Sequence, residues 1–121
     1  MTPRVRALVT MVAGVFSGVA SAADSCDRAT NIVGNCWTVH GRISITNGTP
    51  GVRIWPVGTM RLLAVAGPED NPFMPSDIFS KLTVRNEAFG NFEVCPLTAE
   101  RAHEMQFVCV RSVSKLLVRD R

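Results

Sequence analysis

The sequence lacks most of the residue patterns that carry catalysis or metal binding. No Cys-x-x-Cys pair occurs, and the only two histidines, His40 and His103, lie far apart in the chain, so the usual ligand spacing of a zinc site is missing. No Gly-x-Ser-x-Gly sequence occurs either, which argues against the nucleophile turn of an α/β-hydrolase. We therefore expect no catalytic residue, no metal site and no cofactor.

A strong charge of one sign is also absent. The 121 residues contain 13 Lys and Arg and 10 Asp and Glu, and two of the basic residues, Arg4 and Arg6, lie in a segment that we expect to be removed. The remaining 11 basic and 10 acidic side chains alternate along the chain. This balance predicts no stripe of positive charge along a phosphate backbone, and hence no nucleic-acid partner.

The chain has no apolar run long enough to span a bilayer. The longest run, residues 7–19, is shorter than the roughly 20 residues of a transmembrane helix. It follows Arg4 and Arg6 and precedes the small residues Ala20-Ser21-Ala22, which is the pattern of a cleaved signal peptide. We expect a signal peptide over residues 1–22, one domain over residues 23–121, a periplasmic or secreted location, and no membrane span after cleavage.

The chain has only four cysteines, but disulfides between them would stabilise a domain of this size. A domain of roughly one hundred residues buries a modest core, and cysteines of exported proteins usually form disulfides. Three pairings of Cys26, Cys36, Cys95 and Cys109 exist. We favour the sequential pairing, Cys26 with Cys36 and Cys95 with Cys109.

A β-hairpin is the best-defined element of the sequence. Apolar and polar residues alternate over residues 37–46, and Val52 and Ile54 alternate with Arg53 and Trp55 on the returning segment. The residues between them, 47–51, include glycine, asparagine and proline, which are typical of chain reversals. We expect Gly48 to adopt a positive φ in this turn.

The rest of the chain predicts further short strands and one helical turn. The apolar segment Met60–Ala66 favours a buried third strand, and the proline-rich residues 67–75 favour a loop. Ser76-Asp77 could cap a short helix. Phe92 and Val94 alternate with polar residues in a strand that ends at Pro96. Residues 105–111 and 113–119 have the composition of a pair of C-terminal strands. We expect an all-β fold, a small antiparallel β-sandwich of 5–7 short strands with one short helical turn.

Several turn sequences resemble the prealbumin fold of transthyretin-like and carboxypeptidase-regulatory-like domains. The resemblance is carried by Gly41-Arg42-Ile43, Asn47-Gly48-Thr49-Pro50, Val52-Arg53-Ile54-Trp55 and Gly90-Asn91-Phe92-Glu93, with Glu87 about where that family has an acidic turn residue. It implies a β-sandwich. The hydrolases of this family carry a C-terminal Tyr-Arg-Gly-Ser, whereas this chain has no tyrosine and ends Val118-Arg119-Asp120-Arg121. The resemblance therefore implies the fold and not that activity.

Exposed apolar residues indicate where the domain could bind a partner. If Val52 and Ile54 point into the core, Trp55 points outward, and Phe73 and Met74 lie in the proline-rich loop. These residues either cover the far side of the sandwich or form a protein-binding patch. We predict an exported, non-catalytic module that acts through protein or envelope contacts. The alternative is a small periplasmic metal-binding protein or enzyme that uses His40 or His103.

Overall fold

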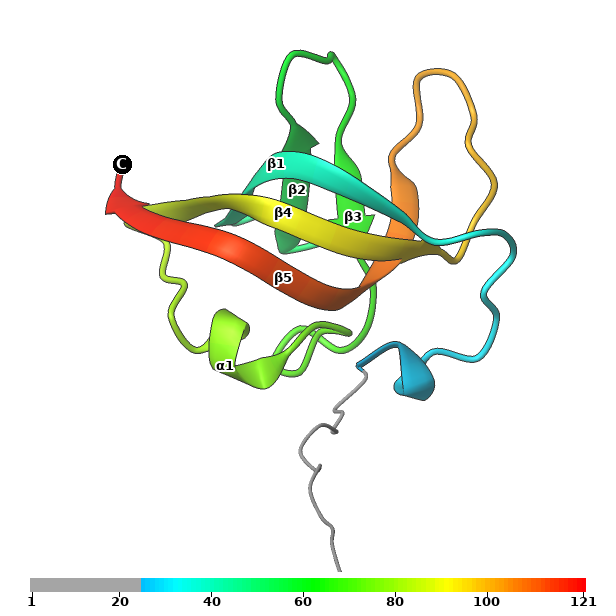
Figure 1. Cartoon of the computed structure of the whole chain (residues 1–121), viewed down its shortest axis with the longest axis horizontal. Coiled ribbons are helices and arrows are strands. Elements are labelled where there is room, and N and C mark those ends of the chain that lie inside the picture. Colours follow the sequence, from blue (N-terminus) through cyan, green and yellow to red (C-terminus); the bar gives the residue numbers. More distant parts are fainter. Residues whose placement is uncertain (1–24) are drawn as a thin grey trace, which may run out of the picture.

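Five strands account for most of the regular structure in residues 25–121, the part of the chain that the computed structural model describes (Figure 1). The predicted signal peptide lies outside these residues. A 3-10 turn, η2, opens the described chain, and one short helix, α1, separates the third and fourth strands. The elements are η2 (Ser25–Arg28), β1 (Trp37–Ile45), β2 (Val52–Pro56), β3 (Leu63–Val65), α1 (Ser76–Phe79), β4 (Asn86–Pro96) and β5 (Gln106–Asp120).

The five strands close into one barrel in the order β1-β2-β3-β5-β4. Every neighbouring pair is antiparallel except β3 and β5, which run parallel over three residues each. The predicted all-β class, the strand number and the short helix are confirmed. The strands form one closed sheet and not two stacked sheets, because β5 pairs with β3 while β4 pairs back with β1.

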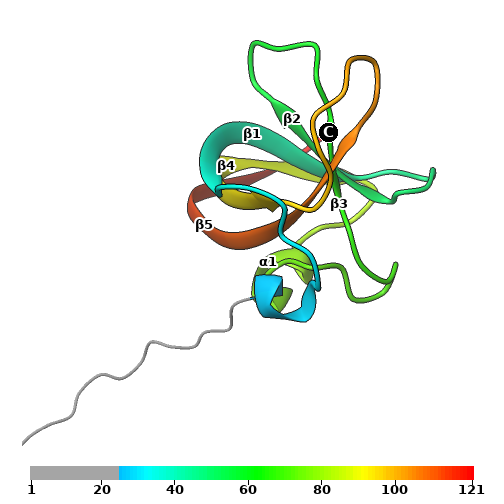
Figure 2. The same ribbon diagram turned by 90° about the vertical axis from the view of Figure 1, so that its right-hand side faces the viewer.

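Apolar side chains from every strand fill the barrel. Ile43, Ile54, Leu63 and Phe92 are all fully buried in one continuous core. Side chains from α1 and its flanking loops, namely Met74, Ile78 and Leu82, join the same core. In Figures 1 and 2, α1 lies on the opposite side of the barrel from the β2–β3 and β4–β5 loops. These two loops are therefore free of the core-forming helix.

The predicted hairpin is confirmed, but its turn differs from the prediction. Ile43 lies opposite Ile54, so the parity of both strands is as expected, with Trp55 on the outer surface. Gly48 is not among the glycines with positive φ, which are Gly58 and Gly67. The prediction for Gly48 is wrong because the reversal extends over residues 46–51 and is closed by a hydrogen bond from the Thr46 amide to the Gly51 carbonyl (2.7 Å).

Replacement of Gly67 by alanine is expected to destabilise the fold by about 1 to 3 kcal/mol, because residues with a side chain rarely adopt the backbone conformation that Gly67 has. Gly67 follows β3 at a φ of 107°, and a Cβ there would lie 2.8 Å from the Phe73 amide nitrogen. Urea unfolding measures the change. Gly58→Ala is the matched control, since φ is 85° there but nothing lies within 4 Å of the added carbon. Equal losses in the two variants would contradict a contact with Phe73.

Two helix and strand predictions need smaller corrections. The third strand is only Leu63–Val65, because Met60 and Leu62 are exposed in the preceding turn. The predicted Ser76-Asp77 cap is wrong, since Pro75 occupies the N-cap position of α1 and no side chain caps the helix.

The two predicted C-terminal strands are one strand, β5, with irregularities. Its register against β4 shifts once between Phe89 and Asn91 and once between Glu93 and Val94. At the first shift, Lys115 and Leu116 lie between the paired residues Ser114 and Leu117, whereas β4 has only Gly90 there, and Lys115 adopts a φ of 54°. The Ser114-Lys115 sequence thus marks a bulge and not a chain reversal.

The predicted cysteine pairing is also wrong. The disulfides are Cys26–Cys109 and Cys36–Cys95, and no described cysteine is free. Cys95 and Cys109 are cross-strand neighbours in β4 and β5, yet each bonds to a cysteine of the N-terminal segment that crosses this part of the sheet. Cys26, Cys95 and Cys109 form a second, smaller core, against which Ala29, Phe73 and Leu97 pack.

Candidate functional site

The outer surface of β2, β1, β4 and β5 carries a row of large side chains in cross-strand register. Trp55 on β2 lies opposite Arg42 on β1. Arg42 in turn lies opposite Phe89 on β4, and Phe89 lies opposite Leu117 on β5. On β1, β2 and β4 these positions alternate with buried residues, so their side chains point away from the core. The row crosses four strands, and its last member, Leu117, is 62% exposed.

Arginines stack on both aromatic rings of this row. The Arg42 guanidinium carbon lies 4.8 Å from the centre of the Trp55 ring, and that of Arg119 lies 5.0 Å from the centre of the Phe89 ring. One carboxylate, Glu87, connects the two arginines, with its oxygens 3.7 Å from Arg42 Nε and 3.4 Å from Arg119 Nε. Such contacts restrict the side chains before any ligand arrives.

Two further arginines lie at the edge of the same surface and have no carboxylate partner among residues 25–121. Arg53 Nε donates a hydrogen bond to the Pro50 carbonyl (3.1 Å). Arg121 donates to the carbonyls of Asn86 (3.1 Å) and Ile45 (2.9 Å). We call this surface the arginine–aromatic face and define it by Arg42, Arg53, Trp55, Glu87, Phe89, Leu117, Arg119 and Arg121. It holds four guanidinium groups against one carboxylate and is therefore positively charged.

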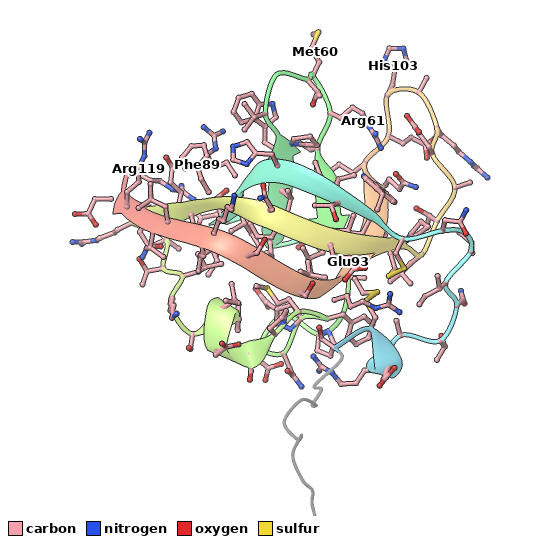
Figure 3. All side chains as sticks on the ribbon, in the orientation of Figure 1. Met60, Arg61, Phe89, Glu93, His103 and Arg119 are labelled. Carbon is pink, nitrogen blue, oxygen red and sulfur yellow. A yellow bond between two sulfur atoms is a disulfide. The ribbon has the colours of Figure 1, made fainter. Side chains whose placement is uncertain are left out.

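Figure 3 shows how two members of this face lie. Phe89 and Arg119 project from the same side of the sheet, near the C-terminus. Arg119 is 61% exposed at its side chain and Arg42 is 40% exposed, whereas Glu87 is 12% exposed. The carboxylate is thus covered by the arginines, and the guanidinium groups are what solvent meets.

The predicted patch of Trp55, Phe73 and Met74 is not one surface. Trp55 lies on the arginine–aromatic face, where its indole Nε1 donates to the Thr59 carbonyl (2.8 Å). Phe73 packs against the disulfide core and lies beneath the Arg28 guanidinium, whose carbon is 5.3 Å from the ring centre. Met74 is 1% exposed in the barrel core. The part of the prediction that includes Met74 is wrong, because the loop turns this side chain inward to close the barrel.

The two histidines occupy separate surroundings. His40 is exposed on β1, with Nδ1 3.0 Å from Asn91 Oδ1. His103 is exposed in the β4–β5 loop and lines a groove of about 440 Å³ together with residues of the β2–β3 loop, including Met60 and Arg61. Figure 3 shows Met60 and His103 at the tips of these two loops. His40 does not line this groove, so one groove does not unite the two histidines.

Sequence reasoning missed Phe89, Arg119, the stacking of Arg119 on the Phe89 ring and the ion pair of Arg119 with Glu87. One signal could have found Phe89: if Phe92 and Val94 face inward, the same alternation extended backward places residue 89 on the outer surface. Arg119 could not be placed in this way, because two register shifts separate it from the start of β5.

Comparison of the chain with family models, with curated proteins and with solved structures found no match. No helix in residues 25–121 is long and apolar enough to cross a membrane.

Proposed function

We propose that this chain is a non-catalytic binding module that contacts an acidic protein partner through the arginine–aromatic face. The observation that carries the proposal is the excess of guanidinium groups over carboxylates around two aromatic rings on an exposed sheet. Tryptophan and arginine are enriched among the residues that dominate binding energy in protein interfaces. Arginine also binds carboxylates through paired, charge-assisted hydrogen bonds.

The stacking geometry favours binding for an energetic reason. Ordering a long side chain on binding costs about 0.5 to 1.5 kcal/mol, and the rings of Trp55 and Phe89 already hold Arg42 and Arg119 in place. Arg53 and Arg121 are held by backbone carbonyls, which do not neutralise their charge. An acidic segment would supply the missing carboxylates. Five-stranded barrels of the OB-fold type bind ligands on strands 2 and 3, and Trp55 and Arg53 lie on β2 of this five-stranded barrel, so analogy of architecture supports a ligand surface on β2.

We also propose that the module acts in the periplasm or outside the cell, after removal of residues 1–22. The two disulfides support this location, because disulfides persist mainly in oxidising compartments. The resemblance to the prealbumin fold remains a prediction based on turn sequences and adds nothing to the proposed function.

The double variant Arg53→Gln/Arg121→Gln is expected to bind fluorescently labelled poly-L-glutamate about tenfold more weakly than the wild type. Two charge-assisted hydrogen bonds are lost, each worth about 1.5 to 3 kcal/mol before solvent and salt weaken it, and tenfold corresponds to about 1.4 kcal/mol. Fluorescence anisotropy at two salt concentrations measures the affinity. Neither substitution removes a partner of Glu87, so the fold is expected to be retained.

The matched control is Lys81→Gln/Arg101→Gln, which removes the same total charge from exposed positions outside the face. It is expected to bind within about twofold of the wild type, because loss of net charge alone has little effect at the higher salt concentration. Equal weakening in both double variants, or no binding by the wild type, would overturn the proposal. Tighter binding of oligo(dT) or of an acidic polysaccharide would identify a different class of partner.

The second candidate function is metal binding by a small envelope protein, and one observation favours it. His103, Met60 and Met105 line the same groove between two loops, and imidazole and thioether groups are ligands of soft transition metals. Thermal melting of the oxidised chain against increasing metal concentration tests this use, because a bound ion raises the melting temperature. An unchanged melting temperature would leave the protein-binding module as the remaining function.

A further inference from the structure

Asn47 is the only asparagine in the sequence that a glycine follows. The other asparagines precede isoleucine, cysteine, proline, glutamate or phenylalanine. An asparagine side chain reacts with its own backbone when the next amide nitrogen reaches the side-chain carbonyl carbon, and glycine has no Cβ to obstruct that approach. The sequence therefore distinguishes Asn47 from every other asparagine as a site for this reaction.

The β1–β2 loop leaves the reacting groups open to solvent. Asn47 and Gly48 are both exposed. A hydrogen bond from the Thr46 amide to the Gly51 carbonyl closes the base of the loop (2.7 Å). Within residues 25–121, neither the Asn47 side chain nor the Gly48 amide is held by a hydrogen bond. The reaction between them therefore breaks no contact of the folded chain.

The Arg53 guanidinium lies directly against this part of the backbone. Its Nη2 atom is 2.8 Å from the position that a Cβ on Gly48 would take. Its Nε donates to the Pro50 carbonyl (3.1 Å), which fixes the guanidinium across the loop. A fixed positive charge stabilises the negative charge that develops on the Gly48 amide nitrogen during attack. The same charge attracts a carboxylate formed on residue 47.

We propose that Asn47 deamidates spontaneously, and that the resulting carboxylate is a slow, one-way switch that weakens the arginine–aromatic face. The Gly48 amide nitrogen bonds to Cγ of Asn47, the bond from Cγ to Nδ2 breaks, and ammonia leaves with the amide proton. Water then opens the succinimide ring at either of its carbonyls, which gives aspartate or isoaspartate at residue 47. The net reaction consumes water, releases ammonia and transfers no electrons.

The effect on the face rests on the proposed function. Arg53 is one of the two arginines of the face that have no carboxylate partner within the described chain, and a carboxylate on residue 47 supplies one. A face with more of its positive charge neutralised binds an acidic partner less strongly. The deamidation itself does not depend on that function, so the two parts are tested separately.

Peptide mapping by mass spectrometry tests the deamidation on the folded full chain. During incubation in mildly alkaline buffer, we expect the peptide that contains Asn47 to gain the mass of an amide-to-carboxyl exchange and to accept methyl groups from an isoaspartyl methyltransferase. Peptides that contain the other asparagines are expected to stay unchanged. Gly48→Ala is expected to slow the reaction by on the order of tenfold, because a Cβ keeps the reacting atoms apart. Gly48 has no positive φ, so alanine fits the same backbone.

Binding of fluorescently labelled poly-L-glutamate tests the switch. Asn47→Asp carries the charge of the product and is expected to bind about threefold more weakly than the wild type, which in free energy is half of the tenfold loss expected for Arg53→Gln/Arg121→Gln. Asn47→Gln is the matched neutral control, because its longer side chain does not close the succinimide ring. We expect it to bind as the wild type does and to keep its mass during incubation.

Three results would overturn the proposal: an Asn47 peptide of unchanged mass, equal rates of deamidation in the wild type and in Gly48→Ala, or equal binding by Asn47→Asp and Asn47→Gln. Failure of the wild type to bind poly-L-glutamate would refute the proposed function and the switch with it. The mass of the Asn47 peptide would still decide whether the loop deamidates.

Discussion

Replacement of Cys26 and Cys109 together by alanine is expected to lower the free energy of unfolding by about 4 to 5 kcal/mol. The disulfide joins residues 83 positions apart, and closing a loop of this length removes about that much conformational entropy from the unfolded chain in the loop-closure account. Both residues are also buried, at 2% and 0% exposure, so the smaller side chains leave unfilled space. Urea unfolding under non-reducing conditions measures the loss.

The second disulfide provides the comparison for this experiment. Cys36→Ala/Cys95→Ala opens a loop of 59 residues, and the loop-closure term for it is only slightly smaller, about 4 kcal/mol. Similar losses in the two double variants are therefore expected. A loss below about 1 kcal/mol for either pair would mean that the unfolded chain is restrained in some other way.

Ile43→Ala is expected to destabilise the fold by about 2 to 5 kcal/mol, the usual cost of truncating a large side chain in a packed core. Ile43 is fully buried in β1, with Ile54 opposite it on β2 and Ala88 opposite it on β4. Neither neighbour can fill the space without moving a strand of the closed barrel. Thermal and urea unfolding of the purified variant measure the change.

Two controls make this measurement specific. Ile32→Ala deletes the same atoms from a side chain that is 43% exposed, so a loss of about 1 kcal/mol or less is expected. Thr46→Ala, on the opposite strand parity, removes a hydroxyl that donates to the Gly51 carbonyl at 3.3 Å and is expected to cost about 1 kcal/mol. If Thr46→Ala cost more stability than Ile43→Ala, the side chains with the parity of Thr46, and not those with the parity of Ile43, would point into the core.

Local patterns predicted the strands better than they predicted how the strands meet. Alternation placed Ile43, Val52 and Ile54 inside and Trp55 outside, because side-chain direction has a period of two in any strand. Barrel closure depends on the pairing of β3 with β5, which are about forty residues apart along the chain. Nothing in either segment alone specifies that partner, so the sequence could not distinguish one closed sheet from two stacked sheets.

The same limit applies to the cysteines and to the candidate site. Cys95 and Cys109 are spatial neighbours, as a hairpin between them predicts, but their bonding partners come from a segment whose path has no regular pattern. On the arginine–aromatic face, Trp55 could be predicted from strand parity. The contact of Arg119 with Glu87 required the register of β4 against β5, which the bulges change.

The bulge at Lys115 has a consequence for aggregation. β3 covers β5 only as far as Val108, so the second edge of β5 beyond this point has no strand partner in the described sheet. A long, flat strand edge is a template on which another chain can add and begin an aggregate. The left-handed backbone and positive charge of Lys115 interrupt this edge near its middle, which leaves two short stretches in place of one continuous template.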